Sequence, residues 1–259
     1  MDTLISNVTV VTMNPRNDVL FGAFIGIDGG KIVSISKKAP EDAPATIIDG
    51  TGMGPAELLN CHGLFNVPTT AAGCTYLEEF ERKLLGKKHV SAVATPLACA
   101  KAGEASTPIL ECVKAGMNVA LGTGGAIECG NLDMFEVIRG ASMQERATAK
   151  NPAALPSAAA LMMATVTGAQ AQGRAAECGM LSEGMDADIV LVDFSAPHLM
   201  PCHNVLNGLT YSAKGGDVAM TMVRGNILYQ NGRFPTIDLQ KVVEELTTYA
   251  IPRLFDESK

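Results

Sequence analysis

The stretch LGTGGAIECGNLDMF, residues 121–135, is the part of this sequence that most suggests a chemical site. A short apolar strand, predicted from Asn118 to Gly122, leads into the turn Thr123-Gly124-Gly125, and a helix is predicted from Leu132 to Gln144. In a parallel βα barrel, a strand end of this kind carries a catalytic side chain at the C-terminal rim. An acid is expected there, but position 124 is glycine. The sequence therefore raises the question of whether a catalytic acid has been lost.

Few other side chains could act in catalysis or bind a metal ion, and they are scattered. They are Glu128 and Cys129 just after the turn, His62 beside Cys61, and the group His198, Cys202 and His203. A catalytic cysteine needs a partner histidine or a depressed pKa, and no histidine lies near Cys129 in the sequence. A single ligand such as His62 does not make a metal site. The simpler interpretation gives these residues structural roles, with the 198–203 group used in packing.

Composition excludes several classes of protein. The chain has 259 residues, of which 47% are hydrophobic, so a sizeable core is expected. A net charge of −7 argues against a nucleic-acid partner and against binding to an acidic membrane surface. No apolar stretch is long enough to span a bilayer, and the N-terminus does not resemble a signal peptide. The seven scattered cysteines, with no CxxC pair, favour a reducing cytoplasm.

The two ends of the chain are predicted to be rich in strands. Short apolar runs fill residues 1–50, and Asp28-Gly29-Gly30 between two of them predicts a hairpin turn. Further strands are predicted at 187–194 and 218–234. The simplest arrangement is one composite β-sandwich domain, formed by residues 1–55 and 185–236. The intervening stretch 36–57 is rich in proline, alanine and glycine and is predicted to be a loop.

Strands alternate with helices in the middle of the chain. The predicted elements are a helix at 76–87, a strand at 90–94, a helix at 108–115, the strand and helix around Gly124, and a long helix from Ser157, its N-cap, to Gly173. Asp133 is predicted to cap the helix that follows it. Alternating elements of this kind predict a parallel sheet over residues 56–184. A final amphipathic helix, Leu239 to Ile251 within residues 237–259, is predicted to stop at Pro252.

Three stretches resemble a known family. Residues 187–218, 154–173 and 115–135 are similar to the closing signature, the last barrel helix and the eighth barrel strand of the amidohydrolase superfamily. Within it, the chain looks closest to the methylthioadenosine/S-adenosylhomocysteine deaminases and the s-triazine chlorohydrolases. The resemblance, which the N-terminal strands share more loosely, covers about three quarters of the chain. It implies an α/β fold in which the β-sandwich accompanies a metallo-dependent-hydrolase barrel, and hydrolysis by water that a zinc or iron ion activates.

The metal site that the resemblance implies is incomplete here. The family takes two histidines spaced H-x-H from its first strand, and His62 matches the first of them, whereas Leu64 stands at the second. Gly124 stands where the family has the aspartate of its T-D-G motif. Ala94 and Cys99 stand at a histidine and an asparagine of the seventh strand, and the histidine of strand five has no counterpart. His62 is therefore interpreted as a vestigial metal ligand.

The spacing of these residues also predicts that part of the barrel is absent. A (β/α)₈ barrel takes about 250 residues, so strand one and strand eight lie roughly 210 residues apart. His62 and Gly124 are separated by 62 positions. The sequence therefore predicts an internally truncated barrel remnant.

Two classes of function remain open. The first is a degenerate amidohydrolase that has no metal cofactor, is inactive alone, and acts as a partner or scaffold subunit in a homo-oligomer or with a fuller amidohydrolase. The second is a metal-dependent aminohydrolase whose zinc or iron site another chain completes. A decayed gene product without a selected role is a third possibility. Oligomerisation is expected in the first two cases, because a partial barrel leaves strand edges and apolar surface uncovered.

Overall fold

The computed structural model describes residues 2–11, 19–38, 44, 46–49 and 53–255. The chain divides into two compact units. The first consists of residues 1–67 and 77–88, and the second of residues 68–76 and 89–259. Each unit is described by itself.

The first unit contains a four-stranded sheet with the order β3-β2-β1-β4. Its strands are β1 (Thr3–Val11), β2 (Val19–Asp28), β3 (Lys31–Ser36) and β4 (Thr46–Asp49). The strands β1, β2 and β3 are antiparallel, whereas β4 runs parallel to β1. The predicted hairpin is confirmed, because Gly29 and Gly30 link β2 to β3 with positive φ angles of 53° and 75°. The prediction of a loop over 36–57 is wrong where β4 forms, since β4 pairs with β1.

Helices complete the first unit. They are α1 (Pro55–Cys61), the 3₁₀ turn η1 (Leu64–Asn66) and α2 (Glu79–Lys87). Residues 62 and 64, where the resemblance places the two histidines of the family's first strand, lie in no strand here. Pro55 opens a helix there, and the buried carboxylate of Glu81 accepts a hydrogen bond from the Ala56 amide at 3.0 Å. The other oxygen of Glu81 accepts from the amide of Glu78 at 3.0 Å, so one side chain satisfies the first turns of both helices.

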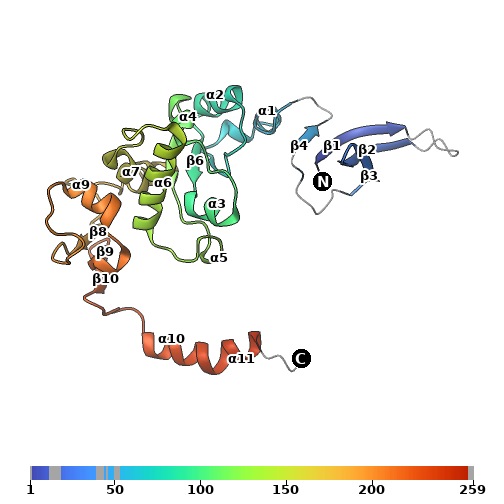
Figure 1. The fold of residues 1–259 in the computed structure, drawn as a ribbon. Coiled ribbons are helices and arrows are strands. Elements are labelled where there is room, and N and C mark those ends of the chain that lie inside the picture. The colour runs from blue at the N-terminus through green and yellow to red at the C-terminus, as the bar shows by residue number, and fades with distance from the viewer. Residues whose placement is uncertain (1, 12–18, 39–43, 45, 50–52, 256–259) are drawn as a thin grey trace. The chain divides into compact units, whose positions relative to one another are not determined.

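The second unit is built around a parallel sheet with the order β5-β6-β7 (Figure 1). These strands are Thr70–Ala72, Ser91–Ala94 and Asn118–Leu121. The helices that follow β6 and β7 along the chain are α3 (Pro96–Ala102), α4 (Ile109–Lys114), α5 (Ala126–Cys129) and α6 (Met134–Ala149). The predicted alternation of strands and helices is confirmed. Ala92, Val119 and Ala120 are buried, as the central residues of a covered parallel sheet should be.

The long helix predicted from Ser157 to Gly173 is two helices, α7 (Ser157–Ala164) and α8 (Val166–Ala171). The backbone breaks at Thr165 (φ −127°, ψ −88°). Ser157 does not cap α7, because its hydroxyl donates to Asn207 Oδ1 at 2.6 Å instead. The break brings Thr167 to the edge of β7, where its hydroxyl donates to the Val119 carbonyl at 2.8 Å. Side chains of the same chain therefore cover this edge of the sheet.

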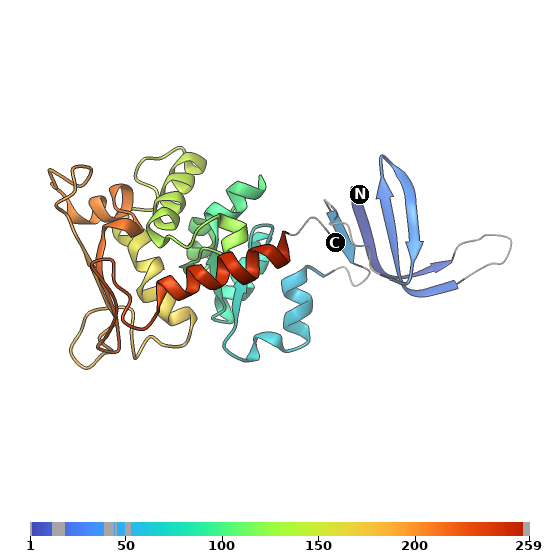
Figure 2. The same cartoon turned by 90° about the horizontal axis from the view of Figure 1, so that it is seen from below.

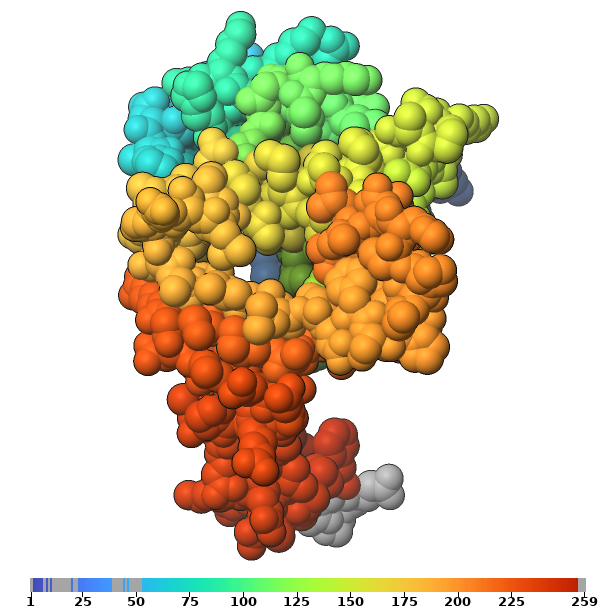
Figure 3. Space-filling view, turned by 90° about the vertical axis from the view of Figure 1, so that its left-hand side faces the viewer, coloured from blue at the N-terminus to red at the C-terminus, as the bar shows by residue number. Residues whose placement is uncertain are grey.

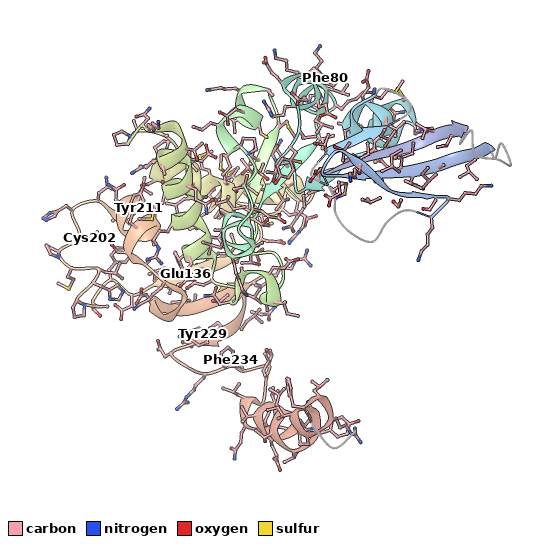
Figure 4. The ribbon with its side chains drawn as sticks, turned by 45° about the vertical axis from the view of Figure 1, so that its right-hand side comes forward. Phe80, Glu136, Cys202, Tyr211, Tyr229 and Phe234 are labelled. Carbon is pink, nitrogen blue, oxygen red and sulfur yellow. The ribbon has the colours of Figure 1, made fainter. Side chains whose placement is uncertain are left out.

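The second unit also contains an antiparallel sheet with the order β10-β9-β8. Its strands are β8 (Ile189–Val192), β9 (Val218–Val223) and β10 (Asn226–Gln230). Three short helical elements precede β9, namely α9 (Val205–Asn207), the π turn η2 (Gly208–Ser212) and the 3₁₀ turn η3 (Gly215–Asp217). Figure 4 labels Tyr211 of η2. Its hydroxyl lies 2.8 Å from Ser142 Oγ and joins η2 to α6. The two terminal sheets belong to different units, so their union in one sandwich stays a prediction.

The chain ends in a helical segment that contains α10 (Leu239–Glu245), the π turn η4 (Leu246–Ala250) and α11 (Ile251–Leu254) (Figure 2). The prediction that this helix stops at Pro252 is wrong. Pro252 lies in the first turn of α11, where its missing amide hydrogen interrupts no bond within that helix.

Candidate functional site

The carboxyl ends of the three parallel strands meet at one edge of their sheet. Ala72 pairs with Val93, and Ala94 pairs with Leu121, so the residues that follow β5, β6 and β7 converge. A cavity of about 500 Å³ lies at this edge. We call it the rim cavity, and its polar lining residues include Thr95, Cys99, Lys101, Glu104 and Glu128. Such a position is where α/β proteins of this kind place their ligands.

Local hydrogen bonds hold the polar groups of the rim cavity. Thr95 Oγ1 lies 3.8 Å from Cys99 Sγ, one turn further along α3. Lys101 Nζ donates to the Ile127 carbonyl at 2.7 Å and so connects α3 to α5. The side chains of Tyr76 and Ile127 form an apolar lip, since these residues are 78% and 91% exposed. The cavity therefore combines one cation, two carboxylates and exposed apolar surface.

The carboxylate of Glu128 lies beside Gly124, at the position where an acid is expected from the sequence. Gly124 has a φ of +69°, and a β-carbon built on it would lie only 2.3 Å from Glu128 Oε2. This carboxylate accepts a hydrogen bond from the Gly125 amide at 2.5 Å, which keeps it folded back over the turn. Because residue 124 has no side chain, the acid at this strand end comes from the following helix. The sequence singles out Glu128 as a possible base just after the turn, but the placement of its carboxylate over Gly124 is visible only in the structure.

Other predicted residues lie away from the rim cavity. His62 follows α1 in the first unit and is exposed, as is Leu64 two residues later. No observation tests the interpretation of His62 as a vestigial ligand, which stays a prediction. Ala94 is buried inside the sheet, whereas Cys99 faces the rim cavity. Cys129 donates a hydrogen bond to the Asn131 carbonyl.

The 198–203 group contains one ion pair and no cluster around it. His198 Nε2 lies 2.9 Å from Asp217 Oδ2, which also accepts from the Lys214 amide at 3.0 Å. Burial opposes the charge of Asp217, but the bonds from His198 and Lys214 outweigh it and hold the pKa of this carboxyl below its usual range. Cys202 and His203 are exposed. The pair connects the loop after β8 to the start of β9, which is a structural role.

The predicted capping role of Asp133 is confirmed, and its carboxylate has a second contact. Oδ1 accepts from the Phe135 amide at 2.9 Å at the start of α6. Oδ2 accepts from the Gly215 amide at 2.8 Å, 82 positions further along the chain. Asp133 therefore fixes the segment after the rim cavity to the turn before β9.

A metal centre does not fit the described part of this chain. Among these residues, no group of three or more histidine, cysteine, aspartate or glutamate side chains is arranged to hold a metal ion. Glu104 and Glu128 are the carboxylates of the rim cavity, and no histidine lines it. Within the same residues, no helix is both long and apolar enough to cross a membrane.

These features define a βα protein with a ligand-sized cavity at the carboxyl ends of its parallel strands. Residues 36–228 match the amidohydrolase family, and the chain belongs to that family. The predicted family is therefore confirmed. The neighbouring solved structures share a metallo-dependent-hydrolase fold, and the residues described here form part of it, with three parallel strands and no closed barrel.

The chain is similar to several deaminases and to a chlorohydrolase. It is 40% identical over 194 residues to a 5'-deoxyadenosine deaminase of Methanosarcina mazei, covering 75% of this chain and 44% of that protein. It is 37% identical to a 5-methylthioadenosine/S-adenosylhomocysteine deaminase of Acetivibrio thermocellus, covering 74% and 44%. The chain thus spans less than half the length of these relatives.

Two solved structures with zinc are also similar. An adenosine deaminase from Xanthomonas campestris with bound zinc has a TM-score of 0.73 at 31% identity, covering 76% of this chain and 45% of the other. An atrazine chlorohydrolase from Arthrobacter aurescens TC1 complexed with zinc has a TM-score of 0.69 at 26% identity, covering 76% and 44%.

Proposed function

We propose that this chain is a non-catalytic member of the amidohydrolase family that acts as a partner or scaffold subunit. The observation that carries the proposal is the chemistry of the rim cavity. Position 124 is glycine, the cavity has no histidine, and no three potential ligands come together among the described residues. Without a metal-activated water, hydrolysis of an aromatic amine has no adequate nucleophile at neutral pH.

The edge strand β5 supports the partner role. β7 is covered by Thr167, but β5 has only three residues, and Thr70 and Ala72 are exposed. An edge strand presents backbone N–H and C=O groups that can pair with another chain, although the shortness of β5 limits how many it offers. The partner is a second copy or a fuller amidohydrolase. A cytoplasmic location is part of the same proposal, because the free thiols of Cys99 and Cys129 suit a reducing compartment.

Glu128 favours one alternative function. Its carboxylate lies at the strand end where the family resemblance implies an acid, beside a cavity large enough for a small heterocycle. The alternative is a metal-dependent aminohydrolase whose histidine ligands, and with them zinc or iron, come from another chain. Hydrolytic deamination is then the reaction, as the names of the relatives suggest.

Metal content and ammonia release separate the two functions. The chain is purified without chelator, analysed for zinc and iron, and screened for ammonia release from purines, nucleosides and triazines. We expect less than about 0.1 metal ion per chain and no turnover above background. The same assays are repeated after mixing with a full-length 5'-deoxyadenosine deaminase. About one tightly held metal per chain, or turnover by the chain alone that Glu128→Gln abolishes, would refute the non-catalytic proposal.

A further inference from the structure

The rim cavity is formed by one continuous stretch of the chain. Its lining residues all lie between Gly73 and Glu128, on the loops and helices that follow β5, β6 and β7. The segments after residue 150, which are yellow, orange and red in Figure 3, contribute none of them. The kind of ligand that fits the cavity can therefore be inferred from this stretch alone.

The charged side chains of the rim cavity favour a cation. Lys101 Nζ donates to the Ile127 carbonyl at 2.7 Å, which holds this ammonium group against α5. The Glu128 carboxylate accepts from the Gly125 amide at 2.5 Å. The Glu104 carboxylate has neither a hydrogen bond nor an ion pair with any residue that the structure describes. One ammonium group and two carboxylates leave the lining with one net negative charge, which attracts a cation.

The two carboxylates lie at opposite ends of α3. A β-carbon built on Gly124 would lie 2.3 Å from Glu128 Oε2 and 3.5 Å from the Ala98 β-carbon, which places this carboxylate beside the first turn of α3. Glu104 follows the last turn of α3, and its amide donates to the Cys99 carbonyl at 2.9 Å. The carbonyl end of a helix already carries partial negative charge, so a cation beside Glu104 is favoured twice. The α3 wall of the cavity therefore offers a carboxylate at each end.

Apolar surface accompanies these charges. Tyr76 is 78% exposed and Ile127 is 91% exposed, and both line the cavity. The face of an aromatic ring attracts a cation, and a planar cation also stacks on it. A volume of about 500 Å³ is within the range of small-molecule sites. The cavity therefore suits a small ligand that combines a positive charge with an apolar body.

We infer that the rim cavity binds a small planar organic cation, an amidinium or guanidinium group attached to an apolar ring. Such a cation donates N–H bonds to carboxylates in its own plane, while its faces pack against an aromatic ring such as that of Tyr76. The inference rests on the proposed non-catalytic function, because a cavity without a metal-activated water holds its ligand without hydrolysing it. It names the class of ligand that this subunit holds.

Three probes of similar shape and different charge test the inference. They are para-fluorobenzamidine, para-fluorobenzamide and para-fluorobenzoate, which are cationic, neutral and anionic at neutral pH. Titration with the full chain, followed by fluorine NMR, gives the dissociation constant of each probe. An exposed ion pair strengthens binding by up to about fivefold, so two carboxylates should make the amidine bind about tenfold more tightly than the amide. The benzoate should bind more weakly than either.

Substitutions locate the charges that the amidine recognises. Glu104→Gln and Glu128→Gln should each weaken amidine binding by about two- to fivefold and leave amide binding unchanged, and the double variant should remove the preference. Tyr76→Ala should weaken amidine binding by about two- to fivefold. The matched control is Glu183→Gln, which changes the net charge equally but replaces an exposed residue outside the cavity, so amidine binding should not change. Thermal melts followed by circular dichroism check that each variant is folded.

The outcomes separate this inference from the proposed function. Equal binding of the amidine and the amide would overturn the inference and leave the non-catalytic function standing. A loss of amidine binding in Glu183→Gln as large as in Glu104→Gln would also overturn it, because the net charge of the chain would then account for the preference. Bound metal or ammonia release, measured on the same preparation without probes, would instead refute the proposed function.

Discussion

Restoring an aspartate at position 124 should destabilise the protein rather than rebuild a catalytic site. Three effects of Gly124→Asp can be estimated from the turn. The φ of +69° costs a residue with a β-carbon about 1 kcal/mol. The new β-carbon, 2.3 Å from Glu128 Oε2, displaces that carboxylate and removes its bond to the Gly125 amide, a net loss of about 1 kcal/mol at this exposed position.

The third effect is repulsion between the two carboxylates. Like charges about 4 Å apart in water repel by about 1 kcal/mol. The expected total for Gly124→Asp is therefore about 2–3 kcal/mol in the free energy of unfolding. Gly124→Asn has the same shape without the charge, so it should cost about 1 kcal/mol less.

Urea unfolding of a double-mutant cycle measures these terms. Gly124→Asp and Gly124→Asn are compared in the wild type and in Glu128→Gln, which keeps an acceptor for the Gly125 amide. The difference between Asp and Asn should vanish with Glu128→Gln, and in about 1 M salt, where the Debye length is only about 3 Å. None of the variants should release ammonia from adenosine-type substrates. Costs that add within about 0.5 kcal/mol across the cycle would refute the placement of Glu128 beside Gly124.

Two further predictions concern carboxylates away from the rim cavity. Burial is the main cause that raises the pKa of Glu145, whose Oε1 accepts from the Ile109 amide at 3.0 Å. The protonated Glu145 carboxyl therefore stabilises the fold at low pH, and this stabilisation is lost as the pH rises through the raised pKa. In urea unfolding, the free energy of unfolding of Glu145→Gln should match or exceed that of the wild type at pH 7 but not at pH 4. Glu145→Leu should lose about 1–3 kcal/mol at both pH values, because it leaves the Ile109 amide unpaired. If Glu145→Gln and the wild type showed the same dependence of stability on pH, the raised pKa of Glu145 would be contradicted. Bonds from His198 and Lys214 lower the pKa of Asp217, so Asp217→Asn should lose about 1 kcal/mol of unfolding free energy above pH 4. This deficit should shrink as the pH falls below about 3.8, the usual pKa of an aspartate. A deficit that does not depend on pH would count against this ion pair.

Local patterns in the sequence were enough to predict much of the second unit. The predicted strand 118–122 matches β7 and the predicted helix 132–144 overlaps most of α6, because their apolar periodicity and the Asp133 cap are encoded locally. The glycines of the β2–β3 hairpin were equally informative, since few other residues adopt positive φ. The family resemblance was also available from short motifs, because those motifs lie in the residues 36–228 that match the family.

Tertiary contacts decided the features that the sequence did not reveal. Residues 55–61 form a helix partly because Glu81, 25 positions away, accepts from Ala56, and α7 ends where Thr167 reaches the carbonyl of Val119, 48 positions away. The carboxylate at the rim comes from Glu128 because the missing side chain of Gly124 leaves room for it. Each outcome depends on atoms that only folding brings together. Local periodicity cannot report such contacts, because their energies arise from groups far apart in the chain or from space that a neighbour leaves empty.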